Sequence, residues 1–286
     1  MTIETVGVVG AGTMGHGIAQ VLAQHGCQVR LYDAAPGAVD SALARIDASL
    51  QRFERKAQIG AGVRAATLDR LQVASSLGAL ADCALVIEAA SENETVKREI
   101  FTALDTLCMP QTLLASNTSS IPIVRIAAWT TRPAQVIGMH FMNPVALMPL
   151  VEVVRAPQTG DACWRQITGL AQRLGKTPVT VNDAPGFVSN RILMPMINEA
   201  AFALYEGVAD AAAIDAIMTL GMNHPQGPLA LADRIGLDTC LAIMDVLYRE
   251  FRDDKYRACP LLARKVAAGE LGRKSGRGFY LYTEDE

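Results

Sequence analysis

The chain has 286 residues, half of them hydrophobic, and is long enough to bury a sizeable core in two domains. Its net charge of −3, with 19% charged residues, excludes the broad basic surface of proteins that bind nucleic acids or anionic membranes. No apolar run approaches the roughly eighteen residues of a membrane span, and the N-terminus carries no signal-peptide pattern. The cysteines are scattered without metal-binding spacing, as in reduced cytosolic proteins. We therefore expect a cytoplasmic protein with no metal site, no nucleic-acid partner and no membrane partner.

Short apolar runs alternate with helix-length amphipathic segments through the first two thirds of the chain. This alternation is typical of βαβ units that build a parallel sheet. The apolar runs predict strands covered on both faces, at Thr5–Val9, Gln28–Tyr32, Leu71–Ala74, Ala84–Glu88, Leu113–Ser116, Gln135–Met139, Leu150–Val154 and Thr177–Val181. Helices are predicted at Gly15–His25, Pro36–Lys56, Glu94–Leu107 and Asp161–Leu174.

The pattern changes between Asn182 and Phe187, where Pro185 and Gly186 interrupt the chain. Beyond this point apolar residues recur at helical spacing, on one face at Leu193, Ile197, Ala200 and Leu204 and on another at Leu237, Leu241, Met244, Tyr248 and Phe251. We predict an α/β chain, with a Rossmann-type dinucleotide-binding domain over residues 1–184 and an all-α C-terminal domain over residues 185–286. A helical domain this apolar commonly buries part of its surface against a second subunit, so we expect a homodimer.

The segment Gly10-Ala11-Gly12-Thr13-Met14-Gly15 directly follows the first predicted strand and leads into a helix. In that context Gly10 suits a tight turn, Gly12 a close approach to a pyrophosphate, and Gly15 close packing of the helix on the strand. Asp33 ends the second strand, where a carboxylate binds ribose hydroxyls and repels the 2′-phosphate of NADP. The pattern therefore favours NAD, although FAD and, in looser variants, SAM bind through the same fingerprint.

His140 directly follows the predicted strand Gln135–Met139, at the carboxyl end of the sheet, where open α/β proteins bind their ligands. Glu152 lies inside an apolar strand, where a buried carboxylate is costly unless it is paired. Paired with His140, it would stabilise the imidazolium while the other ring nitrogen takes a hydroxyl proton as hydride leaves the same carbon. The same two residues could equally form a core ion pair without chemistry.

Three other polar groups each have a structural and a functional interpretation. The segment Ala115–Ser120 is either a turn with capping hydroxyls or a set of donors for a substrate oxygen. Asn190 opens the second domain, either as an ordinary helix start or within reach of a cleft between the domains. Arg52, Arg55 and Lys56 form either a solvated helix face or an anchor for phosphates.

Taken together, these motifs closely resemble those of the 3-hydroxyacyl-CoA dehydrogenase family, and within it the bacterial 3-hydroxybutyryl-CoA dehydrogenases. The resemblance covers essentially the whole chain. Its motifs lie at Val8–Gly15, Val86–Ala89, Ala115–Ser120, Gly138–Val145, Leu150–Val153, Asp183–Arg191, Gly227–Leu229 and Leu271–Tyr280.

The resemblance implies reversible, NAD-dependent oxidation of an (S)-3-hydroxyacyl-CoA to the 3-oxoacyl-CoA, with short chains such as 3-hydroxybutyryl-CoA favoured. It implies catalytic roles for His140 as general base, Glu152 as its partner, and Ser119 and Asn190 beside the reacting oxygen. The cofactor contacts it implies, with those of the glycine motif, are Gly10, Gly12, Thr13, Met14, Gly15, Asp33, Glu92, Lys97, Asn117, Ser119 and Asn143. The implied contacts to the acyl-CoA substrate are Ser119, Asn143, Asn190, Arg52 and Lys56.

The sequence departs from the family pattern at Met142, Ala146, Pro149 and Ser189, and these departures leave the acyl-chain preference open. Two alternative functions are a dehydrogenase of a free hydroxy or sugar acid on the same scaffold, and a non-catalytic dinucleotide-binding relative. Arg52 and Lys56 argue against the first, because a small acid needs no distant phosphate anchor. The presence of both His140 and Glu152 argues against the second.

Overall fold

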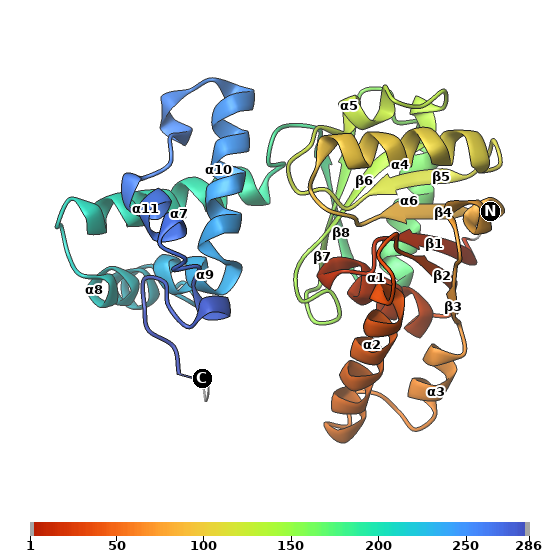
Figure 1. Cartoon of the computed structure of the whole chain (residues 1–286), viewed down its shortest axis with the longest axis horizontal. Helices are drawn as coiled ribbons and strands as arrows, with labels where there is room; N and C mark the ends of the chain where they lie inside the picture. The colour runs from red at the N-terminus through yellow and green to blue at the C-terminus, as the bar shows by residue number, and fades with distance from the viewer. Residues whose placement is uncertain (1–2, 284–286) are drawn as a thin grey trace. The chain divides into compact units, whose positions relative to one another are not determined.

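The computed structural model describes residues 3–283, which fold into two compact units. The first unit ends at Ala184 and the second begins at Pro185. The first unit is built around a sheet, and the second is helical (Figure 1).

Among the described residues, eight strands of the first unit form one sheet, in the order β3-β2-β1-β4-β5-β6-β7-β8. Their bounds are β1 Thr5–Val9, β2 Gln28–Tyr32, β3 Leu71–Val73, β4 Leu85–Glu88, β5 Leu113–Ser116, β6 Val136–Phe141, β7 Leu150–Arg155 and β8 Thr177–Asn182. Strands β1 to β6 pair in parallel, whereas β7 is antiparallel to β6 and carries β8 in parallel beside it. The strand order reverses between β1 and β4, and a doubly wound sheet binds its dinucleotide outside the carboxyl ends of the strands at that point.

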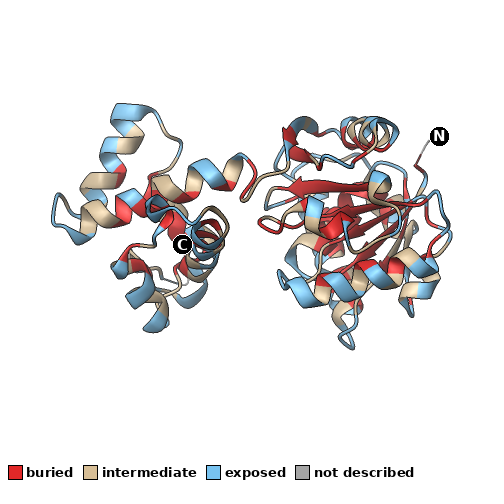
Figure 2. Cartoon of the chain, turned by 90° about the horizontal axis from the view of Figure 1, so that it is seen from above, coloured by how far each residue is buried: buried red, intermediate tan, exposed pale blue. Residues whose placement is uncertain are grey.

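Helices lie on both faces of this sheet, so the central strands are buried between them (Figure 2). The helices are α1 Thr13–Gln24, α2 Ala38–Arg55, α3 Val63–Leu68, α4 Glu94–Leu107, α5 Ile123–Ala127 and α6 Asp161–Arg173. Each longer helix turns one apolar stripe inward; in α2 this stripe is Val39, Ala42, Ile46 and Leu50. Burial of one such leucine or isoleucine stabilises the fold by about 1.5–3 kcal/mol.

The strands lie where the apolar runs predict them, with three differences. Strand β6 continues to Phe141, so His140 lies inside the strand and not after it. Strand β7 is antiparallel, although a parallel sheet was predicted. Strands β3 and β8 are not covered on both faces, because they are the two edges of the sheet; Val73 is 58% exposed and Val179 44% exposed.

The second unit is built from α7 Ser189–Tyr205, α8 Ala211–Ala216, η3 Ile217–Gly221, α9 Pro228–Ile235, α10 Leu237–Phe251 and α11 Pro260–Ala267. Its described residues form isolated β-bridges near the C-terminus but no strand. Helix α7 buries Ile197 and Ala200 of its predicted face. In α10 the predicted face is partly wrong, since Tyr248 is 42% exposed and the buried residues are Leu237, Cys240, Ile243, Met244 and Leu247.

Within residues 3–283 no helix is long and apolar enough to cross a membrane. In the same part of the chain, no group of three or more His, Cys, Asp or Glu side chains could hold a metal ion. All six cysteines are buried free thiols.

Buried carboxylates fasten the C-terminal segment of the second unit to its helices. The Asp233 carboxylate accepts hydrogen bonds from Phe279 N, Tyr280 N and the Tyr282 hydroxyl, each at 2.9 Å. The Asp215 carboxylate accepts one from the Tyr280 hydroxyl at 2.8 Å. Burial, together with the hydrogen bond to Asp233, raises the pKa of Tyr282 to about 12, so this hydroxyl stays a donor at neutral pH.

We predict that Asp233→Ala lowers the free energy of unfolding by roughly 3 kcal/mol or more. Asp233 is 1% exposed, and each buried donor left without an acceptor costs about 1–3 kcal/mol. Urea unfolding of the variant would measure the loss. The matched control is Asp210→Ala, which removes a single exposed helix cap on Ala213 N and should cost about 1 kcal/mol. Equal losses in the two variants would contradict the fastening role of Asp233.

Candidate active site

The glycine-rich turn joins β1 to α1 at the carboxyl edge of the sheet. Gly10 has φ +102°, and a β-carbon there would lie 2.5 Å from the carbonyl oxygen of Ala89. A β-carbon at Gly15 would lie 1.8 Å from the carbonyl oxygen of Gly10. Gly12 is exposed, and a β-carbon there would meet nothing within 4 Å. The turn is therefore closed tightly on the protein side and open on the outer side, as a backbone cradle for a pyrophosphate requires.

Asp33 lies at the end of β2, directly beside this turn. Its carboxylate accepts hydrogen bonds from Ala11 N at 2.7 Å and from Ala35 N at 2.8 Å. The first of these bonds braces the glycine turn, a role that the sequence pattern does not reveal. The side chain is half-buried, so it can also accept bonds from a ribose. The residues present therefore fit the adenosine half of NAD.

The structure places His140 and Glu152 directly opposite each other on β6 and β7. His140 Nδ1 lies 2.7 Å from Glu152 Oε2, and the two residues are 8% and 2% exposed. Opposite residues of an antiparallel pair have their β-carbons about 4.5–5.5 Å apart, which suits this contact. Because the carboxylate engages Nδ1, proton transfer to a ligand would use Nε2.

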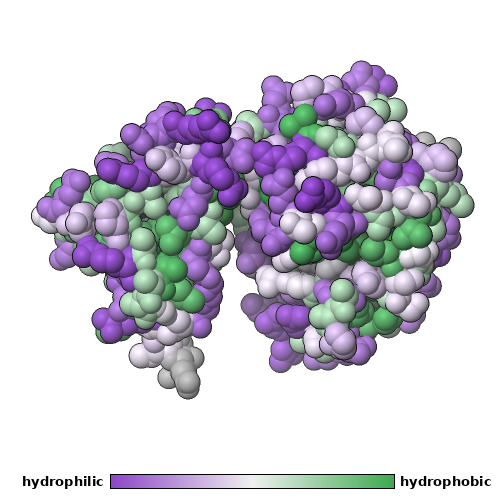
Figure 3. Space-filling model, turned by 45° about the horizontal axis from the view of Figure 1, so that its top comes forward, coloured by the Kyte–Doolittle hydropathy of each residue, from purple (hydrophilic) through white to green (hydrophobic). Residues whose placement is uncertain are grey.

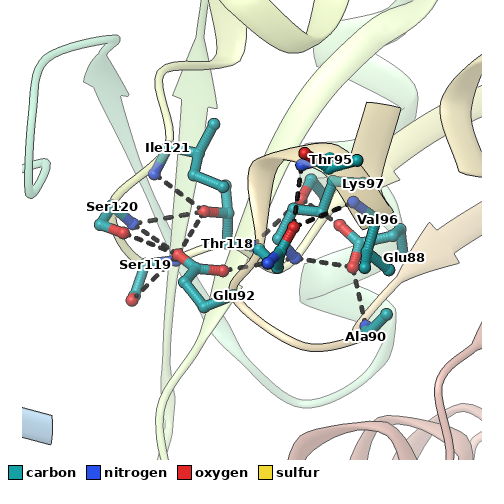
Figure 4. Close-up of polar contacts among 12 residues, drawn as sticks. Glu88, Ala90, Glu92, Thr95, Val96, Lys97, Thr118, Ser119, Ser120 and Ile121 are labelled. Atoms are coloured by element: carbon teal, nitrogen blue, oxygen red, sulfur yellow. Dashed lines mark hydrogen bonds and ion pairs between the residues drawn. The ribbon is translucent and has the colours of Figure 1, made fainter. Parts of the chain in front are cut away.

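A second polar cluster joins Glu92 to the loop that follows β5 (Figure 4). Glu92 Oε1 accepts hydrogen bonds from Thr118 Oγ1 at 2.6 Å, Ser119 N at 2.9 Å and Ser120 Oγ at 2.8 Å. Burial alone would raise the pKa of Glu92, but the Lys97 charge and these hydrogen bonds outweigh it and lower the pKa. Glu92 is therefore a carboxylate at neutral pH, and one of its oxygens fixes three consecutive loop residues.

Lys97 connects this cluster to the sheet. Its ammonium lies 2.7 Å from Glu88 Oε1 and 3.3 Å from Glu92 Oε2, and its side chain is 1% exposed. Glu88, which is fully buried at the end of β4, also accepts a hydrogen bond from Ser116 Oγ at 2.6 Å. A buried lysine needs such counter-charges, because an unpaired buried charge is strongly unfavourable.

Glu88 belongs to the cluster, although the sequence does not single it out as a site residue, whereas Ser116 lies in the hydroxyl-rich segment that the sequence does single out. The available signal was a glutamate at the end of an otherwise apolar strand, with a lysine nine residues later in a helix. If the strand is buried, the carboxylate and the ammonium each need a partner of opposite charge. Only the fold shows that they satisfy each other.

Asn117 links the Ala115–Ser120 segment to the histidine strand. Its Oδ1 accepts a hydrogen bond from Phe141 N at 2.9 Å, and its own N donates to Glu88 O at 2.8 Å. The ends of β4, β5 and β6 are thus tied together. Ser119 is half-buried in this loop, and Asn143 is exposed just beyond β6.

Within the first unit, Arg52 and Lys56 lie apart from this edge. Arg52 is in the last turn of α2 and Lys56 just beyond it, and both are exposed. Helix α2 runs away from the sheet (Figure 1), and at 1.5 Å per residue Arg52 lies roughly 20 Å along it from its first residue. Asn190 is buried near the start of α7 and belongs to the second unit.

Family models match both units. The model of the 3-hydroxyacyl-CoA dehydrogenase NAD-binding domain matches residues 5–184, and that of the C-terminal domain of the same family matches residues 186–282. The match of the first unit identifies NAD as the cofactor.

Individual relatives agree over nearly the whole chain. A probable 3-hydroxybutyryl-CoA dehydrogenase of Bacillus subtilis is 53% identical over 284 residues, which is 99% of each chain. Another, of Deinococcus radiodurans, is 55% identical over 276 residues, 96% of this chain and 99% of that one. The crystal structure of the (S)-3-hydroxybutyryl-CoA dehydrogenase PaaH1 from Ralstonia eutropha superimposes with a TM-score of 0.95, at 49% identity, over 99% of this chain and 100% of that one.

These matches confirm the resemblance seen in the motifs, and with it the Rossmann-type first unit and the helical second unit. The chain is an NAD-dependent oxidoreductase and belongs to the 3-hydroxyacyl-CoA dehydrogenase family.

Proposed function

We propose that the chain oxidises (S)-3-hydroxybutyryl-CoA to acetoacetyl-CoA with NAD, and catalyses the reverse reduction. The observation that carries this proposal is the buried pair of His140 and Glu152, 2.7 Å apart near the carboxyl ends of the strands. Relatives at 53% and 55% identity that carry the name of this activity support the choice of substrate.

The proposed chemistry separates a proton from a hydride. Bound NAD supplies the hydride acceptor. His140 Nε2 takes the proton of the 3-hydroxyl as the hydride leaves the same carbon, and Glu152 stabilises the imidazolium that forms. Ser119 and Asn190 hold the substrate oxygen by hydrogen bonds. In the reverse direction His140 returns its proton to that oxygen.

For the cofactor we propose contacts along the carboxyl edge of the first unit. The glycine turn, with Thr13 and Met14, holds the pyrophosphate, and Asp33 holds the adenosine ribose. Glu92, Asn117, Ser119 and Asn143 lie on the nicotinamide side. Lys97 is enclosed between two carboxylates, so we assign it an indirect role, acting on the cofactor through Glu92.

For the substrate we propose that Arg52 and Lys56 bind phosphates of CoA. Both side chains are exposed one helical turn apart at the end of α2, and cationic side chains there can reach a large anionic ligand. A free hydroxy acid would have no use for them. We further assign cofactor binding to residues 1–184, and substrate binding with dimerisation to residues 185–286.

We predict that the chain oxidises NADH with acetoacetyl-CoA at least about a hundredfold more efficiently than with free acetoacetate. The two substrates differ by the CoA moiety, and two charge-assisted phosphate contacts are together worth about 3 kcal/mol or more. Absorbance of NADH at several substrate concentrations measures kcat/KM for each. Equal values would favour the free-acid dehydrogenase, and the absence of turnover with either would favour the non-catalytic relative.

The same assay tests the proposed phosphate contacts. Replacing Arg52 and Lys56 with alanine should raise KM for acetoacetyl-CoA and leave KM for NADH unchanged, since only the substrate loses contacts.

The assay also tests the choice of cofactor. NADPH should be a poor substitute for NADH, because the Asp33 carboxylate would repel its 2′-phosphate.

We predict that His140→Ala lowers kcat by about 10²–10⁴-fold, the usual contribution of a general base, without weakening NADH binding. Glu152→Gln keeps the size of the side chain but not its charge, so its kcat should lie between those of the wild type and His140→Ala. Steady-state kinetics and NADH fluorescence titration measure the two effects. The control is His25→Ala, whose ring hydrogen-bonds a carbonyl of its own helix at 2.9 Å, away from the proposed base. A kcat of His140→Ala equal to that of the wild type would contradict the role of His140 as general base.

We also propose that two copies associate through the second unit. Several large apolar side chains of this unit are exposed, among them Ile192 at 67%, Leu220 at 88% and Met222 at 61%. Hydrophobic surface is visible on this unit in Figure 3, and contiguous exposed apolar surface commonly marks an interface. Sedimentation should find a dimer that Leu220→Glu weakens. A wild-type monomer at working concentration would exclude the proposal.

A cytoplasmic location is the final part of the proposal. Six free, buried thiols are typical of a reducing compartment, where disulfides do not persist. Fractionation of the native cell would test it, and recovery outside the cytoplasmic fraction would contradict it.

A further inference from the structure

Lys176 is a buried cation that takes no part in the site described above. It lies between the end of α6 and the start of β8 and is 9% exposed. Its Nζ donates hydrogen bonds to Val145 O at 2.5 Å and to Met148 O at 2.8 Å. Over residues 3–283 no carboxylate forms an ion pair with it, and burial lowers its pKa. Burying a lysine whose only partners are backbone carbonyls costs free energy, because no carboxylate offsets the lost hydration of its charge. We therefore looked for a structural role that these two hydrogen bonds serve.

Both acceptor carbonyls belong to one short segment, residues 142–149, which we call the β6–β7 loop. It connects the strand of His140 to the strand of Glu152. The loop is therefore continuous with the ends of the two strands that carry the proposed base and its partner. Lys176 approaches it from β8, the neighbour of β7 in the sheet.

The rest of the loop is held from other sides. Val145 is 3% exposed and packs on α1, where a β-carbon at Gly17 would lie 2.9 Å from Val145 Cβ. Thr177 N donates to Pro149 O at 2.7 Å. By contrast Asn143 is exposed, and Leu147 is 60% exposed. The loop thus has a fixed inner side and an exposed outer side.

We propose that Lys176 is a positioning residue for the dehydrogenase reaction, whose ammonium fixes the β6–β7 loop so that Asn143 is presented to the bound ligands. The role of Asn143 rests on the proposed function, whereas the clamp itself rests on the geometry. Hydrogen bonds from a charged donor are roughly twice as strong as neutral ones. An ammonium therefore holds two carbonyls more firmly than a neutral side chain or a water molecule would.

The competing interpretation is that Lys176 only adds stability. In that case its removal lowers Tm and leaves the kinetics of the folded enzyme unchanged. If it positions the loop, its removal lowers kcat/KM in enzyme that is still folded, because a displacement of about 1 Å at a reacting centre costs up to 10²-fold.

The test compares Lys176→Met, Lys176→Arg and a control in the same unit. Arg132 is the control, because its side chain is 11% exposed and it donates to the carbonyls of Asp105 and Cys108 at 2.6 and 3.3 Å. It lies at the amino ends of the strands, away from the site. We expect Lys176→Met to lower kcat/KM for acetoacetyl-CoA about 10- to 100-fold with NADH binding intact, and Lys176→Arg to restore part of it. Arg132→Met should lower Tm only.

A double-mutant cycle with Asn143→Ala identifies the route of the effect. If Lys176 acts through Asn143, the double variant loses little more activity than either single variant, since coupled residues are not additive. Additive losses, or a fall in Tm with unchanged kinetics, would overturn the positioning role.

Hydrogen exchange tests the clamp without any substrate. The amides of Leu147 and Met148 donate to Pro144 O, and both should exchange faster in Lys176→Met than in wild type or Arg132→Met. Unchanged exchange would overturn the clamp. Since this measurement needs no turnover, it still decides the question if acetoacetyl-CoA is not the substrate.

Discussion

The antiparallel pairing of β6 with β7 sets a histidine opposite a glutamate inside the sheet, where the glutamate could not remain charged alone. The carboxylate of Glu152 is 2% exposed, and an isolated buried charge costs several kcal/mol. The contact with His140 offsets that cost and at the same time engages Nδ1, so that Nε2 is the nitrogen of the proposed proton transfer. Stability and the proposed chemistry therefore depend on the same contact. Because both residues lie on hydrogen-bonded strands, the geometry is held by the sheet and not by a mobile loop.

The same requirement organises the other half of the site. Lys97 is buried because Glu88 and Glu92 neutralise it, and Glu92 then fixes the loop that carries Ser119. The buried ammonium of Lys97 is thus connected through the carboxylate of Glu92 to the hydroxyl of Ser119 at the edge of the sheet. Asn117 joins this cluster to β6, so the serine loop and the histidine strand are positioned by one continuous set of polar contacts, buried except at Glu92. Each member is satisfied, which is the condition under which such networks rigidify a site.

The sequence predicted the strands well because continuous apolar runs in βαβ units have few other structures open to them. It could not predict the direction of β7, since the spacing of apolar residues is the same in parallel and antiparallel strands. The sequence pattern ends the predicted strand at Met139, because the next side chain, His140, is polar. The backbone hydrogen bonds of β6 nevertheless continue to Phe141. Tyr248 was assigned to the core of the second unit because an aromatic residue at helical spacing looks buried, whereas α10 turns it outward. The partners of Lys97 come from β4 and from the segment that follows it, and only the folded chain brings them together.

The proposed base and the departures from the family pattern lie in different parts of this fold. The proposed base and its partner lie within strands whose register leaves them no freedom. Three of the four departures from the family pattern, Met142, Ala146 and Pro149, lie in the β6–β7 loop. A loop can change its outer residues without disturbing the strands that it joins, provided that its inner side stays anchored. Lys176 and Val145 supply that anchor. With the proposed roles, this division lets one arrangement of histidine and glutamate serve different hydroxyacyl substrates when the outer residues of the loop differ.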